Sequence, residues 1–161
     1  MSSTSARRRL PIGQLLGRLQ RHFRLALYRR AREAGYTDVR EAHLQVFGTI
    51  DWTGTRLTDL AARANMTRAS MAELVDELER NGYVERRPDP EDGRAKRVCL
   101  TRRGRKLMTR ALRAVEEIER VYASAIGTER FERMCRSLQT VLEAQSQESG
   151  AAGGRSPRVR P

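Results

Sequence analysis

The chain has 161 residues, of which 32 are Lys or Arg and 20 are Asp or Glu, giving a net charge of +12. This length suits one compact domain or two small lobes that share long helices, and the charge predicts affinity for polyanions. The sequence has no apolar run of about 18 residues and no secretory signal, which excludes a membrane partner and predicts a cytoplasmic protein.

Both ends of the chain are basic and lack apolar periodicity. Residues 1–11 and 149–161 each contain three arginines and no acidic residue, so half of the positive excess lies in the body of the chain. We expect residues 1–11 and 148–161 to be disordered basic tails.

Long stretches with helical spacing of apolar residues flank the middle of the chain. The spacing predicts a long helix from residue 12 to about Arg32, ending near Gly35, and a second helix over about residues 39–51. Thr101 is expected to cap a third long helix, and Gly127 separates that helix from the last one. The apolar positions on the first and last of these helices exceed what a single 50-residue module covers, which predicts a partner surface.

Two short helices and a turn are expected between the second and third of these. Thr58 is a candidate cap for a short helix that ends at Ala64, and Asn65-Met66 supplies the turn. Thr67 is expected to cap the next helix, whose C-terminal stop is Asn81-Gly82.

A strand, a turn-rich loop and a second strand follow. Residues 83–87 and 97–100 are short and partly β-branched or aromatic, and they flank the loop of residues 88–93. Basic side chains surround this hairpin. A helix-turn-helix followed by a basic wing predicts duplex DNA as the partner.

The same segment resembles a known family. LTDLAARANMTRASMAELVDELERNGYVERRPDPEDGRAKRVCLTRRGRKL, residues 57–107, is similar to the winged helix-turn-helix of MarR-type (multiple antibiotic resistance regulator) transcription factors. The similarity is carried by LERNGYVERR, by the Asp-x-Arg of the wing and by the Leu-Thr-x-x-Gly that follows. It implies a mostly α protein with a small β-hairpin wing (α+β). Residues 36–100 would form the DNA-binding domain, and residues 12–35 and 101–147 the long dimerisation helices.

The resemblance also implies roles for individual residues. Asp92 would brace the wing, so that Arg94 can enter a minor groove, where A·T-rich DNA attracts a guanidinium. Arg68 is our candidate for reading guanine in the major groove, and Glu73 could accept from cytosine or pair with a nearby Arg. The expected DNA-binding residues are Thr67, Arg68, Ala69, Ser70, Glu73, Arg86, Asp92, Arg94, Lys96 and Arg97.

A symmetric homodimer on a pseudo-palindromic operator is a further implication, as is a ligand-responsive repressor. Relatives bind small phenolic or lipophilic anions between their lobes, so we expect a small aromatic or lipophilic anionic effector. Its candidate contacts, which would serve equally well as core packing, are His22, Tyr28, His43, Phe47 and Trp52.

Several alternatives stay open. Cys99 on the returning wing strand could be a redox sensor. We expect no cofactor and no metal site, because Cys99 and Cys135 fit no metal-ligand spacing. A non-specific architectural nucleic-acid-binding protein, or an interaction module that titrates another regulator, would use the same charges. The sequence lacks enzyme motifs such as G-x-S-x-G and the P-loop, so we expect a non-enzymatic, nucleoid-associated protein.

Overall fold

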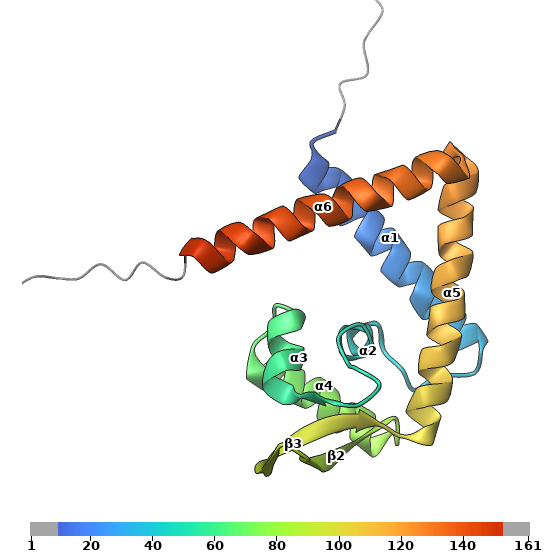
Figure 1. Ribbon diagram of the computed structural model, residues 1–161. Coiled ribbons are helices and arrows are strands. Elements are labelled where there is room, and N and C mark those ends of the chain that lie inside the picture. The colour runs from blue at the N-terminus through green and yellow to red at the C-terminus, as the bar shows by residue number, and fades with distance from the viewer. Residues whose placement is uncertain (1–9, 153–161) are drawn as a thin grey trace, which may run out of the picture. The chain divides into compact units, whose positions relative to one another are not determined.

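The computed structural model describes residues 10–152, and its side chains as far as residue 145 (Figure 1). The described residues form two compact units, which divide between Glu116 and Glu117. In chain order the elements are α1 (Ile12–Glu33), η1 (Glu41–His43), α2 (Leu44–Phe47), β1 (Thr55–Arg56), α3 (Leu57–Arg63), α4 (Arg68–Arg80), β2 (Val84–Asp89), β3 (Asp92–Leu100), α5 (Arg102–Ile126) and α6 (Thr128–Ala152).

The helices agree with the predicted order and differ in their bounds. Helix α1 ends at Glu33, and Gly35 follows with a φ of +90°, a left-handed conformation that stops the helix. The predicted second helix is too long at both ends, because only η1 and α2 form there. Gly48 ends α2, and the Thr49 hydroxyl donates to the Gln45 carbonyl 2.7 Å away, which supports a turn rather than a further helical turn.

Two of the three predicted N-caps are confirmed. The Thr67 Oγ1 accepts from the Ser70 N–H at 3.1 Å, and the Thr101 Oγ1 accepts from the Gly104 N–H at 3.1 Å. The prediction for Thr58 is wrong, since α3 begins at Leu57 and Thr58 lies inside it. The N-cap is Arg56, two residues earlier, and it makes no side-chain cap.

The wing is an antiparallel sheet with the strand order β1-β3-β2. The short strand β1, which the sequence pattern did not indicate, pairs Thr55 with Val98. Strands β2 and β3 extend into the predicted loop, and their register shifts between Pro88 and Asp89. The hairpin is therefore longer than expected, and its tip narrows to residues 90–91.

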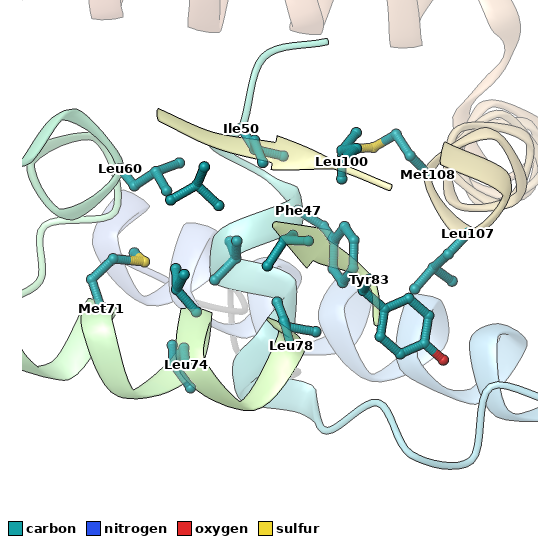
Figure 2. Packing of buried hydrophobic residues seen from close by; sticks show 14 of the residues in the cluster. Phe47, Ile50, Leu60, Met71, Leu74, Leu78, Tyr83, Leu100, Leu107 and Met108 are labelled. Carbon is teal, nitrogen blue, oxygen red and sulfur yellow. The ribbon is translucent and has the colours of Figure 1, made fainter. Parts of the chain in front are cut away.

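One hydrophobic core holds the helix-turn-helix against the sheet (Figure 2). Leu60 of α3, Met71 and Leu78 of α4 and Leu100 of β3 are buried and converge around Phe47. Burying a side chain of this size contributes about 1.5–3 kcal/mol each, so this cluster fixes the orientation of α4. The buried members of the cluster are Val39, Val46, Phe47, Ile50, Leu60, Ala61, Met71, Leu74, Val75, Leu78, Tyr83, Val84, Val98, Leu100, Leu107 and Met108.

The second unit consists of the end of α5 and of α6. Ile118 and Phe131 are buried, whereas Val121, Val141 and Leu142 are more than half exposed. Helix α6 continues to Ala152, so residues 148–152 of the predicted tail are helical. The remaining predicted tail residues, 1–9 and 153–161, lie outside the described residues.

Candidate nucleic-acid interface

Helix α4 buries its apolar face in the core, and the residues at its N-terminal end that lie off this face are exposed. Met71, Leu74 and Leu78 face the core, while the residues before and between them face solvent. Asn65 adopts a φ of +51° in the turn between α3 and α4, a conformation that Asn tolerates well. The exposed group is Thr67, Arg68, Ala69, Ser70 and Glu73.

Arg68 and Glu73 are the charged members of this group. Within the described part of the chain, neither has an ion-pair partner, so the intrachain pairing considered for Glu73 does not form. A free guanidinium at a helix N-terminus is available for the O6 and N7 acceptors of guanine. An unpaired carboxylate beside it is available for the amino group of cytosine.

The wing presents two further cations without an ion-pair partner among the described residues. These are Arg94 and Lys96, and both are exposed. The Asp92 Oδ1 accepts from the Arg94 backbone N–H at 3.1 Å, which is a tight local turn of the kind that the Asp-x-Arg pattern predicts. The turn fixes the backbone from which the Arg94 side chain extends.

Arg97, in contrast, pairs with an acidic residue near the tip of the wing. Its Nε lies 3.0 Å from the Oδ1 of Asp89, and Nε of Arg56 lies 2.6 Å from the other carboxylate oxygen. Asp89 is buried, and it also accepts from the Glu91 N–H at 3.0 Å. This backbone bond and the two guanidiniums hold the pKa of Asp89 well below its usual range.

This cluster was not predicted from the sequence. Asp89 stands between two prolines, and that pattern indicates only a turn. The cluster forms because β1 brings Arg56 beside Arg97, a pairing that depends on the sheet topology.

Arg86 has a similar position on the other side of the hairpin. Its guanidinium pairs with Asp76 and Glu79 of α4, and its backbone N–H donates to the Glu79 Oε1 at 3.0 Å. Three contacts therefore hold β2 against α4. In this structure Arg86 fixes the angle between the two elements, and its cation is already neutralised by the two carboxylates.

A polar cluster around Tyr83 joins the wing to the start of α5. The Tyr83 hydroxyl donates to the Asp38 Oδ1 at 2.6 Å, and Arg103 pairs with the other oxygen at 2.9 Å while its guanidinium lies 4.3 Å from the Tyr83 ring centroid. Burial, together with the Asp38 carboxylate, raises the pKa of Tyr83. Gly104 lies directly against the Tyr83 carbonyl, where a Cβ would collide with backbone. The Leu-Thr-x-x-Gly pattern thus has a packing reason.

The five candidate effector residues lie in different environments. His43 is buried, accepts from the Arg40 N–H at 3.1 Å and contacts the Glu77 Oε2 at 3.0 Å, and Phe47 packs edge-on to Tyr83 in the core. His22 is exposed, and Tyr28 is half-buried on α1. Trp52 is 44% exposed, with the Arg105 guanidinium 5.8 Å from the ring centroid. Only Trp52, Tyr28 and His22 are open to a ligand here.

The two cysteines lie in different environments. Cys99 is half-buried on β3, with its sulfur against Gly54, and Cys135 is exposed on α6. Among the residues that the structure describes, no group of three or more His, Cys, Asp or Glu could hold a metal ion. No helix in residues 10–152 is long and apolar enough to cross a membrane.

The fold and the exposed basic surfaces of α4 and the wing define a winged helix-turn-helix protein. The MarR family model matches residues 51–96. The transcriptional regulator HosA of Escherichia coli O111:H- is 27% identical over 94 residues, which cover 58% of this chain and 70% of HosA.

Solved structures agree with this match. CouR of Rhodococcus jostii RHA1, crystallised with p-coumaroyl-CoA, is 28% identical with a TM-score of 0.66 over 81% of this chain and 90% of CouR. The apo form of MarR from E. coli, at 19% identity, shares the fold with a TM-score of 0.68 over 83% of this chain and 98% of that one. The helix-turn-helix and wing of this chain are therefore similar to those of MarR-family transcriptional regulators.

Proposed function

We propose that this chain is a transcriptional regulator of the MarR family, a non-enzymatic repressor that binds a pseudo-palindromic operator as a homodimer. The observation that carries the proposal is that two arginines are free in the described part of the chain, while two others hold the elements that carry them in position. Arg68 and Arg94 are unpaired within the described residues, whereas Arg86 and Arg97, which the sequence also suggested for DNA, hold α4 and the wing in place. Two cationic probes on braced elements suit adjacent grooves of one duplex.

The two probes have different tasks. Arg68 at the start of α4 would read base edges in the major groove, with the Thr67 and Ser70 hydroxyls on nearby phosphates. Arg94 at the wing tip would enter the neighbouring minor groove, where a narrow A·T-rich segment strengthens its attraction. Lys96 would add a phosphate contact that carries no sequence information.

Dimerisation is supported by unburied apolar faces. On α1, Ile12, Leu15 and Leu19 are 40–58% exposed, and on α6, Val141 and Leu142 are 56% and 68% exposed. Apolar stripes of this kind along helices are typical of faces that a second chain covers. A two-fold dimer would place two copies of α4 about 34–36 Å apart, one turn of B-DNA.

The effector in this proposal is a small aromatic or lipophilic anion. CouR was crystallised with p-coumaroyl-CoA, an aromatic thioester with anionic groups. On this chain, Trp52 offers an exposed ring beside the Arg105 guanidinium, a combination suited to an aromatic anion. Such a ligand would lower operator affinity, and the protein would act in the cytoplasm on the nucleoid.

The test is fluorescence anisotropy with an operator duplex and a scrambled duplex over a series of salt concentrations. The proposal expects a preference of about 10³-fold or more for the operator at moderate salt, and a steep fall in affinity as salt rises. The Arg94→Ala variant should bind the operator more weakly while its circular dichroism stays unchanged. Equal affinity for both duplexes would favour the architectural alternative.

A further inference from the structure

A second cationic surface lies away from α4 and from the tip of the wing. It is an open groove of about 890 Å³ between the first half of α5 and the base of β2. Residues 102–113 of α5 contain six Lys or Arg and no acidic residue. Arg102, Lys106, Arg110 and Arg113 line the groove.

The helical spacing places these four cations on one face. They follow one another at intervals of four, four and three residues, which is one stripe of an α-helix. The opposite face carries Leu107 and Met108, which are buried. All four cations are exposed or open to the groove, and none has an ion-pair partner among the described residues.

Helix stability does not explain this arrangement. Like charges four residues apart repel each other, and cations in a first turn oppose the helix dipole, which favours acidic residues there. The first turn of α5 has no acidic residue. Among the described residues that line the groove, Glu85 alone carries a carboxylate, and it is already paired with Arg87 at 2.5 Å. The stripe therefore lacks the counter-charges that the fold supplies elsewhere.

We propose that this groove binds a free small molecule that carries several phosphate groups. Guanidiniums match phosphate oxygens in a bidentate geometry, and four unpaired cations along one helix face can share a chain of phosphates. The Thr109 hydroxyl and the Tyr36 side chain also line the groove, offering a hydrogen bond and an aromatic contact. A volume of this size accommodates a small molecule.

The groove favours a free phosphate compound over the phosphates of the bound operator. Strand β3 has nine residues, and at about 3.3 Å per residue it separates the tip of the wing from the start of α5 by roughly 25–30 Å. A straight duplex on α4 and the wing tip would not reach the whole stripe. The proposal does not depend on the operator model, because binding is measured without DNA.

The experiment is isothermal titration of the full-length protein with sodium triphosphate, compared with sodium sulfate at equal ionic strength. We expect saturable triphosphate binding with one site per chain and a rise in melting temperature, since the anion relieves repulsion along α5. The variant Lys106→Gln/Arg110→Gln should weaken binding about tenfold. The variant Arg133→Gln/Arg136→Gln, which removes the same charge from exposed positions on α6, should change it by less than about twofold.

Three outcomes would overturn the proposal. Triphosphate could bind no better than sulfate, or both variants could weaken binding equally, which would make net charge sufficient. Binding could instead be lost in Arg94→Ala, which would place the anion on the wing. The operator affinity of Lys106→Gln/Arg110→Gln separates the free phosphate compound from the phosphates of DNA. If this variant binds the operator more weakly and the unsubstituted protein does not bind triphosphate, the stripe is a DNA contact.

Discussion

Asp89 and Arg97 form an ion pair near the tip of the wing, with 3.0 Å between the buried carboxylate Oδ1 and the guanidinium Nε. The second carboxylate oxygen receives Arg56 from β1, so one acidic group joins all three strands of the sheet. The wing is therefore a braced element rather than a free loop.

Replacing Asp89 with Asn should weaken operator binding about tenfold while the helical circular dichroism is retained. The amide keeps the size of the side chain but leaves two guanidiniums without their counter-charge, so the wing loses its fixed position. Anisotropy on the operator duplex measures this effect. The matched control Glu132→Gln removes one exposed carboxylate from α6 and should leave the affinity unchanged. Unchanged binding by Asp89→Asn would show that the brace is dispensable.

Arg68→Ala should remove sequence discrimination while preserving most of the non-specific affinity. A bidentate contact to guanine contributes about 1–3 kcal/mol of discrimination, whereas a lost phosphate contact weakens all sequences alike. Operator and scrambled duplexes are compared by anisotropy at one salt concentration. Arg80→Ala is the control, because Arg80 is an exposed arginine at the other end of α4. If both variants lose the same affinity for both duplexes, Arg68 does not read bases.

Gly104→Ala should destabilise the protein by about 2 kcal/mol or more, because the new methyl group collides with the Tyr83 carbonyl. Gly17→Ala should have the opposite effect on stability. Gly17 lies inside α1 with open space around it, so alanine should stabilise the helix by up to about 1 kcal/mol. Urea unfolding of both variants checks the pair. A neutral Gly104→Ala would mean that α5 can shift freely at its start.

The pH dependence of stability should report His43. Burial lowers the pKa of His43 below its ordinary 6.5, and Glu77 offsets only part of that effect. The unfolded chain then takes up a proton first, so this contribution is complete above about pH 6.5 and is lost as pH falls through the lower, folded pKa. We therefore expect the melting temperature to fall as the pH drops from 7.5 to 5.5.

The variant His43→Gln should flatten this dependence, since glutamine does not titrate. His22→Gln is the matched control, because His22 is exposed on α1 and should leave the slope as it is. A slope that disappears in His22→Gln and persists in His43→Gln would contradict the assignment.

Much of the fold could be predicted because it depends on local rules. The caps at Thr67 and Thr101, the glycine stops and the apolar stripe of α4 follow from hydrogen bonding and helical spacing. The short strand β1 and the brief helix α2 could not be predicted, because tertiary pairing and a side-chain hydrogen bond decide them.

In the candidate site, too, some features could be predicted from the sequence and others could not. Sequence order places Arg68 on the recognition helix and Arg94 on the wing, and the structure shows both exposed. Arg86 and Arg97 look equally suited to DNA in the sequence, yet Arg86 pairs with carboxylates of α4 and Arg97 with the Asp89 carboxylate across the hairpin. Which cations are free therefore depends on how the strands and α4 pack, which spacing along the chain does not encode.

Selection of the full-length protein on random duplex DNA at about 150 mM salt tests the central claim most directly. Our account predicts enrichment of an inverted repeat whose half-sites lie about one helical turn apart, and loss of that enrichment in Arg68→Ala. Recovery of no motif by a soluble, folded protein would contradict sequence-specific operator binding and would leave charge-driven binding as the function of these surfaces.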